Sequence, residues 1–112
     1  MFLSLIRIVP IPEKRDGILE MLVTVARQAK LIHGCRGGTV CEERGNGNAI
    51  LYLESWGSRE ALQRHVRSDL YLRVLHALDL AAEAPEVFFF EISGEKGMEL
   101  IGELREAEEE TK

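Results

Sequence analysis

Three segments of the sequence carry apolar side chains at both their odd and their even positions, and this double pattern constrains the fold most. They are residues 2–9, 50–56 and 87–92, each short and rich in β-branched, leucine or aromatic side chains. Successive side chains of a strand point to opposite faces of its sheet, so a strand of this kind has to be covered on both. A sheet whose two faces are both covered is therefore expected.

Helical patterns separate these strands. Apolar residues recur at steps of three and four over 12–32, which predicts a long amphipathic helix, and Gly34 follows it as a natural left-handed cap. A second helical region runs from Ser58, a candidate N-cap, to Pro85, with a break near Ser68. The second helix is therefore expected to be split.

The second strand is expected over 35–44 and is weaker, because it contains Gly37 and Gly38. The glycine pair predicts a bulge, which serves either to curve the sheet or to let a ligand approach the backbone. The Asn46-Gly47 pair that follows is typical of a tight hairpin turn. The second and third strands are therefore predicted to be antiparallel neighbours.

The order βαββαβ is the ferredoxin-like α+β arrangement, a four-stranded antiparallel sheet with helices on one face. Residues 1–93 form this predicted domain, and 94–112 form an acidic helical extension. One chain has no helices left for the second face, and each Leu or Phe side chain left in water forfeits ~1.5–3 kcal/mol. Exposed patches of this kind mark interfaces, so we predict a homodimer packed sheet against sheet.

One stretch carries a family resemblance. The run Glu54-Ser55-Trp56, then Ser58-Arg59-Glu60-Ala61-Leu62, then His65 and Ser68, resembles the central motif of the antibiotic biosynthesis monooxygenase (ABM) family. The resemblance extends roughly over residues 2–93 and includes the element order and a Gly-Cys pair before the second strand. It implies a dimer whose sheets face each other as a shared barrel. The family includes cofactor-free quinol and anthrone oxygenases.

Such an oxygenase needs an apolar pocket, a base that works near neutral pH and a dipole that holds an anion. His65 is the candidate base, because an imidazole titrates near neutral pH. By resemblance, His65 and Trp56 border the pocket of the family and are the candidate catalytic residues. The candidate substrate-binding residues are Tyr52, Tyr71, Arg7 and Arg73.

Structural roles compete with these assignments. A histidine on the inner face of a helix is more often a hydrogen-bonded packing residue than a base, and Trp56 fits a core equally well. Glu54, unusual in a buried strand, is expected to be paired, with an arginine as the candidate partner. A solvated helix face is the expected place of Arg59, Arg64, Arg67 and Arg73.

The chain also departs from the family pattern. The antibiotic-biosynthesis oxygenases use an Asn together with a Trp, whereas the asparagines here, Asn46 and Asn48, fall in the hairpin turn. Haem-degrading relatives use a histidine on the second helix and an Asn in the first strand. His76 falls one position late, and Ser4 and Leu5 replace the Asn.

The sequence predicts a cofactor-independent monooxygenase that oxidises a small aromatic quinol or phenol with molecular oxygen. The alternatives are a non-catalytic small-molecule-binding dimer and a haem-binding or haem-degrading monooxygenase. No metal site is expected, because His33, His65, His76 and the cysteines lack a ligand spacing.

The remaining expectations concern partners and compartment. A net charge of −5 disfavours nucleic acid, and no stretch is long and apolar enough to cross a membrane. The N-terminus lacks a signal-peptide pattern, which leaves the cytoplasm as the expected compartment. Cys35 and Cys41, if both lie in one strand, are ~20 Å apart at ~3.3 Å per residue, so reduced thiols are expected.

Overall fold

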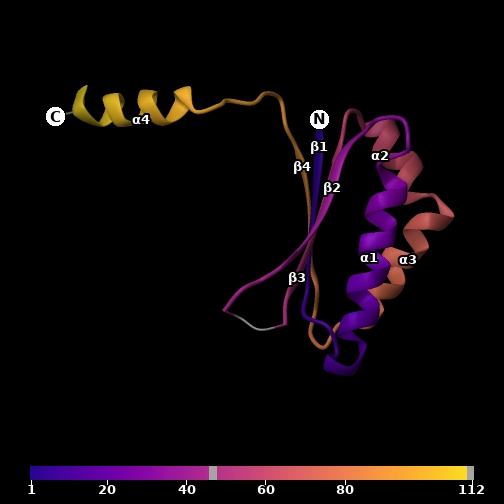
Figure 1. Cartoon of the computed structure of the whole chain (residues 1–112). Helices are drawn as coiled ribbons and strands as arrows, with labels where there is room; N and C mark the ends of the chain where they lie inside the picture. The colour runs from indigo at the N-terminus through magenta and orange to yellow at the C-terminus, as the bar shows by residue number, and fades with distance from the viewer. Residues whose placement is uncertain (46–47, 111–112) are drawn as a thin grey trace.

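The protein, seen here as a computed structural model, is described over residues 1–45 and 48–110 (Figure 1). The elements in chain order are β1 (Phe2–Ile8), η1 (Pro12–Lys14), α1 (Arg15–Ala29), β2 (Cys35–Glu42), β3 (Ile50–Trp56), α2 (Arg59–Val66), α3 (Asp69–Asp79), β4 (Glu86–Glu91) and α4 (Glu99–Glu110). No helix within the described ranges is long and apolar enough to span a bilayer.

The four strands form one sheet in the order β2-β3-β1-β4, and every neighbouring pair is antiparallel. Figure 1 shows α1, α2 and α3 together on one side of this sheet, while α4 lies on the other side. The ferredoxin-like α+β fold predicted from the sequence is therefore confirmed, and its helices cover a single face.

The strand register assigns each side chain to a face. Ser4 in β1 lies opposite Glu54 in β3 and opposite Phe89 in β4, and all three face the helices. Leu5 lies opposite Leu53 and Phe88 on the other side, which we call the open face. Its apolar residues are Leu3, Leu5, Leu51, Leu53, Phe88 and Phe90.

The first helix is shorter than the sequence pattern predicts. Residues 12–14 form a 3₁₀ turn, and α1 ends at Ala29 because the chain tightens there into shorter hydrogen bonds, among them Ile32 N to Ala29 O at 2.9 Å. Gly34 has the predicted left-handed backbone, with a φ of 93°. A Cβ at this position would lie 2.5 Å from the Cβ of Ala61, so glycine also lets α2 approach the loop.

The predictions for the middle of the chain are confirmed in most respects. The register of β2 against β3 shifts between Cys35 and Gly37, so the irregularity lies just before the glycine pair where the bulge was predicted, and both cysteines are free. The predicted turn at Asn46-Gly47 lies outside the described residues. The second helix is split into α2 and α3, and each half is capped by the serine before it, Ser58 or Ser68.

The main core fills the space between the sheet and the helices, where Ile6 and Ile8 of β1 pack with Ile18, Leu22 and Val25 of α1. A smaller core cluster around Trp56 lies nearer the start of α2. β4 has a different environment, since all its residues are exposed and Phe88, Phe89 and Phe90 keep 44–48% of their surface. The helices therefore leave this edge strand uncovered on both faces.

Candidate functional site

A carboxylate buried in the sheet forms the centre of the candidate site. In β3 the alternate residues Ile50, Tyr52, Glu54 and Trp56 face the helices and are fully buried. Burial of an unpaired carboxylate is strongly unfavourable, so Glu54 requires donors. It accepts hydrogen bonds from the Tyr52 hydroxyl, from Trp56 Nε1 at 3.3 Å and from His65 Nε2 at 2.9 Å. We call these four side chains the Glu54 cluster.

His65 reaches this carboxylate from α2, where it lies on the inner face of the helix with a side chain that is 0% exposed. Its ring stacks on Trp56 at a centroid distance of 4.6 Å and meets the edge of Tyr71 at 5.2 Å. The backbone around it is held by Ser68, whose hydroxyl donates to the His65 carbonyl at 2.6 Å. The imidazole is therefore fixed in position on three sides.

The contact with Glu54 determines which imidazole nitrogen is free. A carboxylate only accepts hydrogen bonds, so Nε2 of His65 carries the proton, and Nδ1 of the neutral ring is an acceptor. Nδ1 is buried and has no hydrogen-bond partner within the described part of the chain. The same is true of the hydroxyl of Ser4, which lies opposite Glu54 in the sheet. Two unused polar atoms thus lie in the helix-facing layer around one carboxylate.

The two tyrosines of the site are held as neutral phenols. Burial, reinforced by the Glu54 carboxylate, raises the pKa of Tyr71 to about 12. Burial also raises the pKa of Tyr52 far above its ordinary value, and the nearby charge and hydrogen bond of Glu54 add to the effect. Both phenols therefore remain protonated at neutral pH, and that of Tyr52 donates to Glu54.

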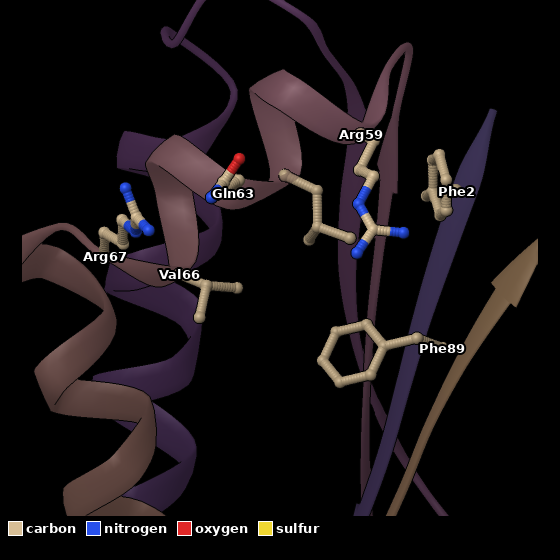
Figure 2. Close-up of a pocket in the computed structure, with 7 residues that line it drawn as sticks. Phe2, Arg59, Gln63, Val66, Arg67 and Phe89 are labelled. Atoms are coloured by element: carbon tan, nitrogen blue, oxygen red, sulfur yellow. The ribbon is translucent and has the colours of Figure 1, made fainter.

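A groove of about 390 Å³ runs between α2 and the strands β1 and β4 (Figure 2). It is lined by Phe2, Arg59, Leu62, Gln63, Val66, Arg67 and Phe89, and we call it the α2–β4 groove. Leu62 and Val66 flank His65 along α2, while Phe89 lies opposite Ser4 in the sheet. The groove therefore shares α2 with the Glu54 cluster, but neither His65 nor Trp56 lines it.

The structure brings four of the six predicted site residues together. Tyr52, Trp56 and His65 belong to the Glu54 cluster, and Tyr71 packs on its histidine.

The two arginines named with them lie elsewhere. Arg7 is on the open face, where it pairs with Glu43 at 2.7 Å and Glu86 at 3.5 Å. Arg73 is exposed on α3 and does not line the groove.

Several features of the site differ from what the sequence indicated. The partner of Glu54 is His65 and not an arginine. Arg59 and Arg67 are exposed, as expected of a solvated helix face, and in addition they line the groove together with Gln63. Their spacing along one helix face, with Leu62 and Val66 between them, was the available signal. This spacing alone does not specify a groove, because the opposite wall is formed by Phe89, which is distant in the sequence and lies uncovered opposite α2.

The haem alternative gains no support from the described residues. His76, the candidate ligand, is exposed on α3 and lies outside the α2–β4 groove. Ser4 and Leu5, at the strand positions where the relatives have an Asn, point to opposite faces of the sheet.

Comparison with known proteins identifies the family. The family model described as antibiotic biosynthesis monooxygenase matches residues 1–77. Among solved structures, Rv0793 from Mycobacterium tuberculosis has a TM-score of 0.76 at 23% identity, covering 86% of this chain and 98% of its own. A protein from Deinococcus radiodurans assigned as an antibiotic biosynthesis monooxygenase has a TM-score of 0.79 at 18% identity, with 88% and 98% covered. At these identities the structural likeness shows the fold.

No curated protein sequence matches the chain significantly. The family model covers more than half of the chain, including the strand and helix that carry Glu54, Trp56 and His65. This chain therefore belongs to the antibiotic biosynthesis monooxygenase family.

Proposed function

We propose that the chain is a cofactor-independent monooxygenase that oxidises a small aromatic quinol or phenol with molecular oxygen. The α2–β4 groove binds the aromatic ring, and His65 accepts the phenolic proton. One observation carries this proposal: the buried Glu54–His65 pair leaves Nδ1 of a fixed imidazole without a partner among the described residues, on the helix that also lines the α2–β4 groove.

The chemistry needs no external reductant. Transfer of a phenolic proton to Nδ1 leaves an electron-rich phenolate, which gives electrons to oxygen and forms a carbon–oxygen bond at the ring. Cleavage of the O–O bond with loss of the ring hydrogen then yields a carbonyl and water. For a quinol, one molecule of substrate and one of O₂ give one hydroxyquinone and one water, so the substrate supplies all the electrons.

In this proposal Glu54 is a positioning residue. Its carboxylate keeps the proton of His65 on Nε2 and stabilises the imidazolium that forms when Nδ1 accepts a proton. Trp56 holds the ring by stacking, and Tyr52 donates to the same carboxylate. The arrangement follows the general rule that a catalytic base is oriented by a third group.

Access to Nδ1 requires side chains of α2 to move. Leu62 and Val66, which flank His65 along α2, line the groove where His65 does not, and Val66 is 38% exposed. Rotamer changes of exposed side chains take picoseconds to nanoseconds, so this gate adds little to the reaction time. Substrate in the groove would displace these side chains and exclude water from the base.

The proposal includes a homodimer packed through the open face. Six Leu and Phe side chains lie on that face, and Phe88 and Phe90 remain 48% and 44% exposed in the single chain. Proteins of this family are commonly dimeric. A second copy of the chain would bury this surface, which accounts for strands that are apolar on both faces.

A non-catalytic binding protein is the second candidate, because His65 does not itself line the groove. Oxygen uptake by metal-stripped protein with a panel of reduced quinols separates the two. We expect uptake above autoxidation, a fall to the autoxidation rate in His65→Gln, and no change in His33→Gln, an exposed histidine. Uptake that survives His65→Gln would remove the base from the proposal. Binding of a quinol in the groove without uptake would establish the second candidate.

A further inference from the structure

We propose that the α2–β4 groove selects aromatic ligands that carry a carboxylate, and that Arg59 and Arg67 recognise this anion. The inference rests on the proposed function, because it names the substrate class of the same groove. It adds a charge requirement that an oxygenase of neutral quinols does not need.

The first observation is the charge of the groove against that of the whole chain. The sequence holds 19 acidic and 14 basic residues, for a net charge of −5. The lining of the groove nevertheless contains two arginines and no acidic residue. Among the side chains that the structure describes, those of residues 1–45 and 48–106, neither arginine takes part in an ion pair. Two unpaired cations beside low-dielectric walls make a local positive potential that concentrates anions.

The second observation is where the arginines lie. Arg59 is the first residue of α2 and Arg67 follows its last, which separates their backbones by about 12 Å at 1.5 Å per residue. Leu62 and Val66 form the apolar wall between them. Figure 2 shows the guanidinium group of Arg59 between α2 and the rings of Phe2 and Phe89, with Arg67 at the other end of the helix. A ligand in the groove would thus meet a cation at either end.

The third observation concerns the ring of the ligand. Phe2 and Phe89 form the strand wall, and Phe89 is 48% exposed, so an aromatic ligand would cover a surface that the chain leaves open. A volume of about 390 Å³ fits a ligand of one or two rings. Arginine pairs with a carboxylate through two parallel N–H donors. A flat aromatic acid could therefore pack its ring against the apolar walls and pair its carboxylate with an arginine.

Arg64 supplies a matched control within the same helix. It is exposed on α2, carries the same charge and does not line the groove. If the arginines of α2 serve only to solvate the helix, Arg59, Arg64 and Arg67 should be equivalent towards a ligand. If the groove selects anions, Arg59 and Arg67 should matter and Arg64 should not.

The test is isothermal titration of the full chain with naphthalene-2-carboxylate and with the neutral naphthalene-2-carboxamide. We expect the acid to bind about tenfold or more tightly than the amide, as for a charge-assisted pair. Arg59→Gln should abolish this preference, Arg67→Gln should reduce it, and Arg64→Gln should leave it intact. Added salt should weaken binding of the acid and not of the amide.

Equal binding of acid and amide, binding of neither, or an equal loss in Arg64→Gln would overturn the inference. Circular dichroism of each variant ensures that a loss is not misfolding. The titration involves no turnover, so its result is separable from the proposed function. Preferential binding of the acid without oxygen uptake would support the carboxylate subsite and contradict the proposed oxygenase. Uptake with neutral quinols but no preference for the acid would support the oxygenase and contradict the subsite.

Discussion

The two faces of the sheet differ in their cover and in their side chains: helices cover one face, which holds buried polar groups, while the other face is apolar and uncovered. On the helix face, Glu54 of β3 and His65 of α2 are both fully buried where α2 packs against the sheet. The open face carries hydrocarbon at its centre, where Leu5 lies between Leu53 and Phe88, and none of the described helices packs over it. The chain thus places its buried polar cluster under its own helices and leaves an apolar surface exposed on the opposite face.

The largest expected effect tests the covered face. Glu54→Ala leaves three buried donors, on Tyr52, Trp56 and His65, without their acceptor. Removal of one partner from a buried charged network lowers the free energy of unfolding by ~3–5 kcal/mol. Urea unfolding followed by circular dichroism measures this loss. Glu60→Ala, an exposed position on α2, is the control, and a loss below ~1 kcal/mol at Glu54 would show that the cluster is not structurally coupled.

The second effect tests the open face. Leu5→Asp places a charge at the centre of the proposed dimer interface, so we expect the dissociation constant of the dimer to rise at least ~30-fold. Sedimentation equilibrium gives this constant directly. Leu31→Asp is the matched control, because Leu31 is 87% exposed and lies outside the sheet. A wild-type chain that is monomeric at every concentration would contradict the proposal that the open face is a dimer interface.

A smaller effect concerns pH and again belongs to the covered face. The pKa of Tyr71 is raised to about 12 in the folded chain from about 10 in the unfolded chain. The contribution of the protonated Tyr71 phenol to the free energy of unfolding is therefore complete below about pH 10 and is lost as the pH rises through about 12. After allowance for solvent screening we expect a loss of about 1–2 kcal/mol, which Tyr71→Phe should remove. Urea unfolding at pH values between about 9 and 12 measures it, and identical curves for the two proteins would contradict the assignment.

The smallest effect concerns α4, which stands clear of the other helices in Figure 1. Ile101 and Leu104 within α4, and Met98 just before it, are 58–83% exposed, so they add little to the stability of a single chain. A chain that ends at Ser93 should unfold within ~4 °C of the full chain in thermal denaturation. A larger fall in melting temperature, seen only at concentrations where the protein is dimeric, would place α4 against the second copy.

The elements were predictable because their signals are local. The split second helix follows from Ser58 and Ser68, each of which caps the helix that begins after it. The strands follow from alternation and turn residues, and the unusual burial of Glu54 was visible as a charge within an apolar run. Each of these signals lies within a few residues of what it specifies.

The contacts of the site were not predictable to the same degree. His65 is 11 residues from Glu54 along the chain, and several arginines competed with it as the partner. The groove depends on how far α2 and α3 extend over β4, which a sequence pattern does not contain. Phe89 reads as a core residue in the sequence and is half exposed in the structure, because the helices stop short of the edge strand.

The stacking of Trp56 on His65 gives the native protein an intrinsic optical probe. Trp56 is the only tryptophan of the chain, so all its indole fluorescence originates at one place, 4.6 Å from the imidazole. A positive charge on that imidazole changes the energy of the excited indole and quenches its emission. The brightness of an unlabelled solution should therefore report whether this histidine gains a proton when a quinol is mixed with the protein in a stopped-flow instrument, as the proposed reaction requires.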